Sequence, residues 1–228
     1  MASIITNLKK YKEKGEFEMR YKVHSFRYGA ELFSREEEFS TLWNELLSVL
    51  DSITDNDLIR HFNSNTRTSK KSLSNSINDL IEDRLGVKGW ARQSAIFNNS
   101  DYRPRSRQRW WTLDFAKGPI CIEVAFNHGE AVAWNLIKPV LASELNHVEK
   151  AIQTKGGIII TATDTLKKAG NFDNSIGTYE KFLQYLAPFR NILTVPLVII
   201  GLDAPVTFKI DREHKIVKRR KLKLKRHK

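Results

Sequence analysis

The sequence predicts an α/β protein in which a mixed central β-sheet is flanked by helices. Short apolar runs rich in β-branched residues recur in the second half of the chain, and such runs are typical of buried strands. Segments with apolar residues at helical spacing lie between them. The resulting order of strand, strand, helix, strand, helix, strand favours a mixed sheet covered by helices.

Helices are expected to dominate the N-terminal part of the chain. Residues 36–63 repeat apolar side chains at helical spacing, with a short second helix at their C-terminal end. A further helix follows a polar loop. Ser74 or Ser76 is expected to cap its start, and Gly86 or Gly89 to end it.

The strands and the remaining helices are expected after residue 110. The stretch from Trp110 to His128 reads as two short strands joined by a Lys-Gly-Pro turn. The later elements are a helix at 131–153 that Pro139 kinks, a strand at 157–163, a helix at 178–187 after a polar loop at 167–177, and a strand at 195–202.

We therefore divide the 228 residues into N-terminal helical elements at 1–70 that pack on the core, a core at 71–212 and a basic tail at 213–228. The last fourteen residues hold nine Lys or Arg and no acid. They form either a polybasic tail that adds affinity for nucleic acid or an edge strand protected by lysines.

Composition narrows the function class. Apolar residues make up 41% of the chain, so global disorder is not expected. The net charge of +12 favours a polyanionic partner. The longest apolar run, 192–202, contains Pro196 and is too short to cross a membrane. No export signal is recognisable, and the single cysteine, Cys121, is expected to be a packing residue, so a reducing cytoplasm is the expected compartment.

Two acids interrupt the apolar hairpin. Asp114 lies in its first strand and Glu123 in its second. A buried carboxylate is costly unless positive charge compensates it, and hard cations such as Mg²⁺ prefer carboxylate oxygens. The pair therefore suggests a metal site for phosphodiester cleavage. The alternative is that Asp114 caps the turn and Glu123 is a solvated edge acid.

Basic residues lie beside this hairpin. A loop that leads into Trp110 holds four arginines, which either contact phosphates or form a solvated loop: Arg103, Arg105, Arg107 and Arg109. The six histidines show no paired-ligand spacing, and no phosphate-binding glycine motif is present, so no nucleotide cofactor is expected.

The hairpin, DFAKGPICIEVAF, resembles the active-site hairpin of PD-(D/E)XK type II restriction endonucleases of the BglII/BstYI group. In that group an Asp lies in one strand and an acidic E-V-(Q or E) triplet on the next. The helix at 78–90, the Ser-Glu-Leu at 143–145 followed by His147, and two later strands, GIIITAT and VPLVIIGL, also resemble family elements. The resemblance runs from about residue 77 to 203.

The resemblance implies that Asp114 and Glu123 bind the catalytic Mg²⁺ and that the carbonyl of Val124 completes the shell. The sequence differs from the family pattern at one position of this motif, because Ala125 stands where the family has Lys, Gln or Glu. The missing group comes from elsewhere, or the enzyme is weakened, or the protein only binds DNA. Candidates for the substitute are Glu82, Gln93 and Glu144.

Family position also indicates residues that read DNA bases, namely Asn127, His128, Asn174, Ser175 and Thr178, since short polar side chains can reach base edges. Asn174 or Ser175 is alternatively only a helix cap.

The resemblance thus implies a restriction-endonuclease-like core and a Mg²⁺-dependent type II enzyme that cuts double-stranded DNA at a short palindromic site as a homodimer. The alternatives are an inactive DNA-binding relative and a basic RNA-binding protein.

Overall fold

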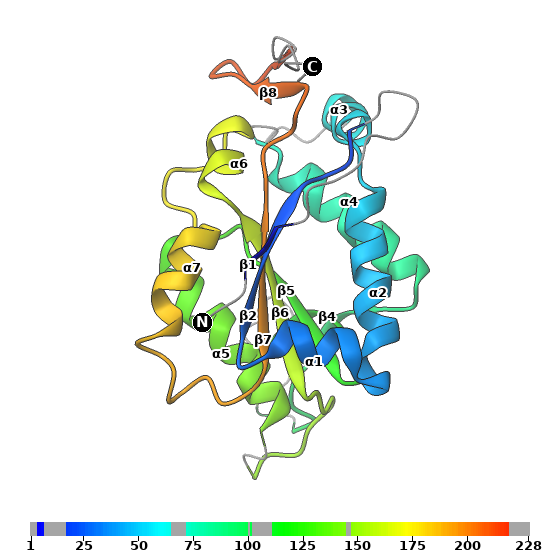
Figure 1. Cartoon of the computed structure of the whole chain (residues 1–228), viewed down its shortest axis with the longest axis vertical. Coiled ribbons are helices and arrows are strands. Elements are labelled where there is room, and N and C mark those ends of the chain that lie inside the picture. Colours follow the sequence, from blue (N-terminus) through cyan, green and yellow to red (C-terminus); the bar gives the residue numbers. More distant parts are fainter. Residues whose placement is uncertain are drawn as a thin grey trace, which may run out of the picture.

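A seven-stranded sheet forms the centre of the protein, in the order β1-β2-β7-β6-β5-β4-β3 (Figure 1). The computed structural model describes residues 4–6, 17–64, 72–99, 101, 111–144 and 147–218. The strands are β1 (Ile4–Thr6), β2 (Tyr21–Phe26), β3 (Ala91–Ala95), β4 (Thr112–Lys117), β5 (Ile120–Val124), β6 (Gly156–Ala162) and β7 (Leu197–Leu202).

The sheet is mixed. The central strands β5, β6 and β7 are parallel, whereas the outer pairs on both sides are antiparallel. Every residue of β6 and β7 is buried, as expected of parallel strands covered on both faces. Glu123 of β5 lies beside Ile159 of β6, which in turn lies beside Ile199 of β7, so the acid has apolar neighbours on its β6 side.

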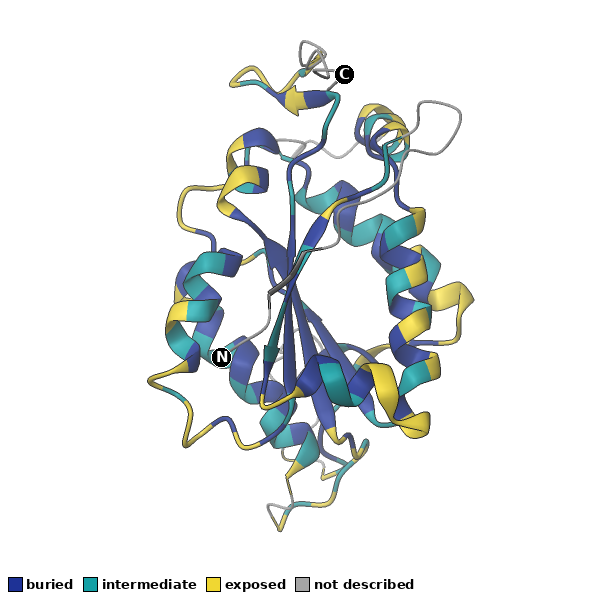
Figure 2. Cartoon of the chain, viewed as in Figure 1, coloured by how far each residue is buried: buried dark blue, intermediate teal, exposed yellow. Residues whose placement is uncertain are grey.

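Helices cover both faces of the sheet (Figure 1). On one face lie α2 (Glu37–Ser52), α3 (Asp55–Ser64) and α4 (Ser74–Val87). Their apolar side chains form one core with alternate sheet residues such as Ile158 and Ile160. On the other face α5 (Val132–Ser143) and α7 (Tyr179–Leu186) pack against the intervening residues, such as Ile159. Figure 2 shows the buried faces of these helices turned toward the sheet, the pattern that helical periodicity predicts.

The smaller elements are α1 (Gly29–Arg35), the 3₁₀ turn η1 (Gly129–Ala131), α6 (Asp164–Ala169) and the hairpin of β8 (Phe208–Ile210) and β9 (Ile216–Lys218). Within the described residues no helix is long and apolar enough to cross a membrane.

The predicted fold class is confirmed, but several element boundaries were wrong. The range 1–70 holds α1–α3, yet it also supplies β1 and β2, which pair with β7 inside the main sheet. It is therefore not only helical. Strand β3, at the opposite edge, was also missed; its first three residues are exposed, and an edge strand of this kind lacks the apolar pattern that predicts a strand.

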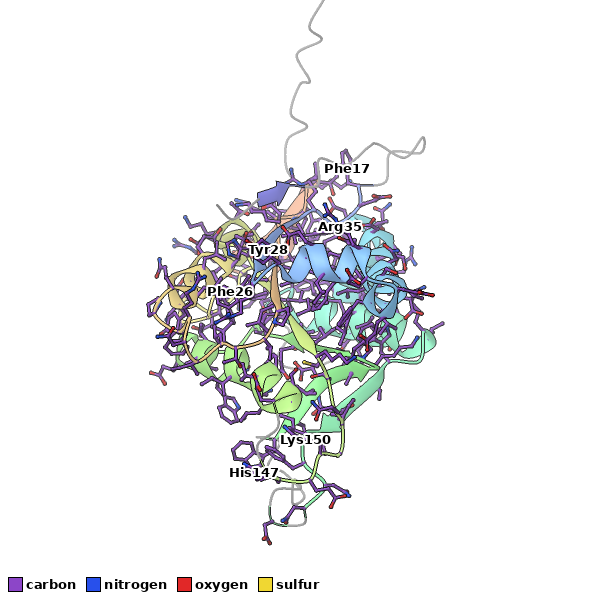
Figure 3. All side chains as sticks on the ribbon, turned by 60° about the horizontal axis from the view of Figure 1, so that its bottom comes forward. Phe17, Phe26, Tyr28, Arg35, His147 and Lys150 are labelled. Carbon is purple, nitrogen blue, oxygen red and sulfur yellow. The ribbon has the colours of Figure 1, made fainter. Side chains whose placement is uncertain are left out.

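The helix predicted at 131–153 contains Pro139 as expected but ends at Ser143. Glu144 is extended, and His147 has a left-handed backbone with φ 58°, so His147 is not the helix residue that its position suggested. Figure 3 shows His147 and Lys150 in the segment after α5, far from Tyr28 and Arg35. This segment returns to α5, where Lys150 Nζ donates to the carbonyl of Leu141.

Two local predictions were also wrong. Ser74 is the first residue of α4 and Leu73 holds the cap position, without a side-chain cap bond. The loop predicted at 167–177 begins inside α6. The described part of the predicted basic tail ends with β9, and residues 219–228 lie outside the described residues.

Candidate active site

Asp114 and Glu123 are brought together by the β4–β5 hairpin. The turn at Lys117-Gly118-Pro119 uses a positive φ of 51° at Gly118, which glycine adopts without strain. The antiparallel register pairs Phe115 with Ile122. Asp114 and Glu123 are the next residues on the two strands just beyond this last pair, and they are close enough for the Asp114 charge to act on the Glu123 carboxyl. Asp114 Oδ2 accepts a hydrogen bond from the main-chain N–H of Val124, at 2.8 Å.

Glu123 is a buried carboxylate with one unsatisfied oxygen. Its residue is 2% exposed. Oε2 forms an ion pair with Lys138 Nζ on α5, whereas Oε1 has no hydrogen-bond partner among the described residues. Burial and the nearby Asp114 charge raise the pKa of Glu123 to about 8, although Lys138 opposes the shift. A single lysine therefore does not compensate the two acids, and a cation would stabilise both.

The three candidates for the missing third catalytic group differ in whether they contact the acidic pair. Gln93 on β3 lies opposite Asp114, and its Nε2 donates to Asp114 Oδ1 at 3.3 Å. Its φ of 47° marks a local distortion of this edge strand. Glu82 on α4 is engaged in an ion pair with Arg92. Glu144 lies just beyond the end of α5 and is exposed. Of these three, only Gln93 has a described hydrogen bond to the acidic pair.

Ala125 has no polar function in this site. It is 2% exposed and packs in the core between the sheet and α5, with Val132 and Leu136. Its main-chain N–H donates to the carbonyl of Ile160, and its own carbonyl accepts from Thr161 Oγ1. Ala125, which replaces the polar residue of the family, is therefore an ordinary core residue in this structure.

Lys138 is the site residue that the sequence prediction missed. It is 8% exposed and belongs to the sheet-facing stripe of α5. A lysine within the apolar stripe of a predicted helix is the signal that could have identified it, because lysine is almost never fully buried unless it is paired.

Two loops with polar side chains meet beyond the end of β5. His128 bridges to Ile176, and the ring of His128 hydrogen-bonds to Ser175 Oγ. The carbonyl of Asn127 accepts from the N–H of Gly177, at 3.0 Å. The predicted DNA-reading residues 127, 128, 174 and 175 are therefore exposed on neighbouring loops, although they are far apart in the sequence.

Thr178 differs from these four residues. It is buried and holds the cap position of α7, without a side-chain cap bond. Neither Asn174 nor Ser175 is the cap residue of that helix, so the capping alternative was wrong for both. The arginines at 103, 105, 107 and 109 lie outside the described residues.

The described residues offer neither a further acidic or histidine ligand for a metal nor a reactive cysteine. Among the described residues, no group of three His, Cys, Asp or Glu side chains is placed to hold a metal, so the acidic pair would need main-chain or water oxygens as further ligands. Cys121 is fully buried, and burial raises the pKa of its thiol to about 12. As predicted, it is a packing residue rather than a nucleophile.

The chain is similar to known proteins over most of its length. The family model described as Restriction endonuclease BglII/BglIII matches residues 21–202, from the first residue of β2 to the last residue of β7. The match thus reaches well before residue 77, where the resemblance in the sequence was first recognisable. A search of curated proteins found no match.

Among solved structures, the chain is similar to restriction endonuclease BglII complexed with a DNA 16-mer, with a TM-score of 0.57, 20% identity and 88% of each chain covered. It also matches free BglII, with a TM-score of 0.47, 18% identity and coverage of 88% of this chain and 91% of that one. The first likeness supports the fold, and the family match covers most of the chain. This protein therefore belongs to the BglII/BglIII family of restriction endonucleases.

Proposed function

We propose that this restriction endonuclease hydrolyses double-stranded DNA at a short palindromic site, with Mg²⁺ bound by Asp114, Glu123 and the carbonyl of Val124. The observation that carries this assignment is the free Oε1 of buried Glu123, on the carboxylate that faces Asp114. A buried acceptor without a partner is costly, and a divalent cation would satisfy it.

The chemistry of these ligands fits magnesium. Carboxylate and carbonyl oxygens are the ligands that Mg²⁺ prefers, usually with several waters retained. When bound, the ion would neutralise charge on the scissile phosphate and lower the pKa of a water. The protein's own contribution is orientation: the bond from Val124 fixes the Asp114 carboxylate, and Lys138 fixes one oxygen of Glu123.

We propose that the exposed loops beyond β5 recognise DNA. Asn127, His128, Asn174 and Ser175 present amide, imidazole and hydroxyl groups, which can hydrogen-bond to base edges in the major groove. The arginines at 103–109 and the basic C-terminal residues would contact phosphates, and the net charge of +12 would favour association with DNA.

We further propose that the protein acts as a homodimer in the cytoplasm. Two-fold symmetry of the protein would match a palindromic site and place one active site on each strand. Each site would leave a 5′-phosphate and a 3′-hydroxyl.

Digestion of phage DNA of known sequence tests this function. The wild-type protein with Mg²⁺ should give discrete fragments whose ends share one palindromic sequence, and EDTA should prevent cleavage. Asp114→Asn should bind the same DNA without cutting it. Cleavage by Asp114→Asn at the wild-type rate would show that the active site is elsewhere.

The same experiment addresses an inactive DNA-binding relative, which Ala125 favours because it supplies no catalytic group. Specific binding to DNA without cutting by the wild-type protein would support that alternative. A preference for RNA over DNA of equal length would instead support the basic RNA-binding protein.

A further inference from the structure

Lys138 is a buried lysine at the centre of the proposed site. Its residue is 8% exposed, and its ammonium pairs with Glu123, whose residue is 2% exposed. Removing both charges from water is expensive, and a well-packed apolar pair of similar size often stabilises a core equally well or better. Stability alone therefore does not account for this lysine.

Helix α5 is held over β5 by two polar contacts. Asn135 and Lys138 lie one turn apart on the buried face of the helix. Asn135 Nδ2 donates to Asn127 Oδ1 at 3.3 Å, and Lys138 Nζ donates to Glu123 Oε2. Both acceptors belong to β5 or to the loop that continues it, so the position of Lys138 relative to the acidic strand is fixed.

The small side chain of Ala125 is complementary to this arrangement. Residues 123 and 125 of one strand point to the same face of the sheet, and Ala125 packs against Val132 and Leu136 of α5. The strand thus lacks a functional group at position 125, while the helix that covers this position carries an ammonium directed at Glu123. The polar group is supplied by α5 instead of β5.

We propose, given the function proposed above, that Lys138 is the third catalytic residue. It positions the attacking water, a role that the side chain of Ala125 cannot perform. One N–H of its ammonium holds Glu123, and another donates to the water that attacks the scissile phosphate. The ammonium has three donors, and among the described residues Glu123 is its one hydrogen-bond partner. Donors thus remain for water or phosphate oxygens.

In the proposed step the attacking water loses one proton to solvent, and its oxygen forms a bond to phosphorus. The bond from phosphorus to O3′ breaks, and the electron pair stays on O3′, which takes a proton from a solvent water. The products are a 5′-phosphate and a 3′-hydroxyl. Lys138 keeps its proton throughout, and its charge stabilises the water oxygen as negative charge develops on it.

Lys138→Met tests this role, because methionine keeps most of the side-chain volume and removes the charge. Single-turnover cleavage with Mg²⁺ should fall by about 10²- to 10⁴-fold, the usual effect of losing one positioned catalytic group. The matched control is Lys155→Met, which removes an exposed lysine paired with Glu38; this variant should cut like the wild type.

A second measurement separates catalysis from support of the fold. Calorimetric titration of the free protein with Mn²⁺ should show binding to Lys138→Met that is equal to or tighter than that of the wild type, because a neighbouring positive charge has been removed. If Lys138 only holds Glu123 in place, Mn²⁺ affinity will fall along with cleavage, and that result would overturn the proposal. Glu123→Gln should lose Mn²⁺ binding and thereby validate the measurement.

Two further variants complete the test. Lys138→Gln keeps a donor for Glu123 without the charge, and it replaces Lys138→Met if that variant does not fold. It should show the same loss of cleavage with retained Mn²⁺ binding. Wild-type cleavage by a folded neutral variant at position 138, alongside an inactive Asp114→Asn, would refute the role of Lys138 but not the proposed function. Normal cleavage by Asp114→Asn, or a wild type that cuts no DNA, would overturn both.

Discussion

Asp114 Oδ2 accepts a hydrogen bond from the main-chain N–H of Val124, at 2.8 Å, where the pairing of β4 with β5 ends. The last residue pair of the two strands on this side is Phe115 with Ile122. Beyond this pair, the Asp114 carboxylate accepts the Val124 N–H in place of a main-chain carbonyl. The two strands therefore stay joined, and the side chains of Asp114 and Glu123 remain adjacent. One contact thus serves both the hairpin and the site.

Asp114→Asn should retain the fold and lose cleavage. Its amide oxygen can still accept the hydrogen bond from Val124, but the charge that would hold a cation is gone. We expect cleavage to fall by about 10²- to 10⁴-fold, with DNA affinity in Ca²⁺ within a few-fold of wild type. Asp83→Asn, on the exposed face of α4, is the matched control and should cut normally.

The stability of the metal-free protein should depend on Glu123. The pKa of this carboxyl is about 8 in the folded state, against an ordinary value of 4.5. Because the folded pKa is raised, the stabilising contribution of the protonated form is fully present below pH 4.5 and is lost as pH rises through about 8. The thermal unfolding temperature of the wild type should therefore decline over this window more steeply than that of Glu123→Gln.

Added Ca²⁺ should reverse this decline. Because binding needs the ionised carboxylate, the increase in unfolding temperature on adding Ca²⁺ should be larger at pH 8.5 than at pH 5.5. Glu123→Gln should show little increase at either pH. An equal Ca²⁺ effect on the wild type at both pH values would argue against Glu123 as a ligand.

Substitution of Ala125 distinguishes an enzyme that lacks its third catalytic group from one in which Lys138 supplies that group. If the missing group weakens cleavage, Ala125→Glu, Ala125→Gln or Ala125→Lys should raise the rate. Because Ala125 is buried against α5 and Lys138 already supplies a charge, we expect no gain from any of them and a loss of stability of about 1–3 kcal/mol from overpacking. Single-turnover rates and denaturant unfolding measure both effects, and a faster variant would contradict the role of Lys138.

Gly157→Ala should disturb the contact of α5 with the sheet. A Cβ at Gly157 would lie 2.4 Å from Cβ of Pro139, the neighbour of Lys138. We expect about 1–3 kcal/mol of destabilisation from overpacking, and reduced cleavage because α5 must shift. The control is Gly86→Ala in α4, where nothing lies within 4 Å of the added Cβ; it should stabilise the protein by up to about 1 kcal/mol. Denaturant unfolding of the two variants should give opposite signs.

Local sequence pattern predicted the acidic hairpin because its determinants are local. The glycine turn, the alternation of β5 and the two acids lie within a few residues of one another. The same holds for the apolar strands β6 and β7 and for helices α2 and α7, whose periodicity is clear. Edge strands such as β3 were missed because solvent covers part of their surface and their residues need not be apolar.

The fold class, the acidic pair and the absence of a polar group at position 125 can all be predicted from the order of residues along the chain. The surroundings of the acidic pair depend instead on how distant segments pack together. The tertiary structure placed Lys138 against Glu123 from a helix 15 residues away, brought residues 127–128 beside 174–176, and inserted β2 beside β7. These relations depend on how helices pack on a sheet and on long-range strand pairing, and neither is encoded in the spacing of residues along one segment.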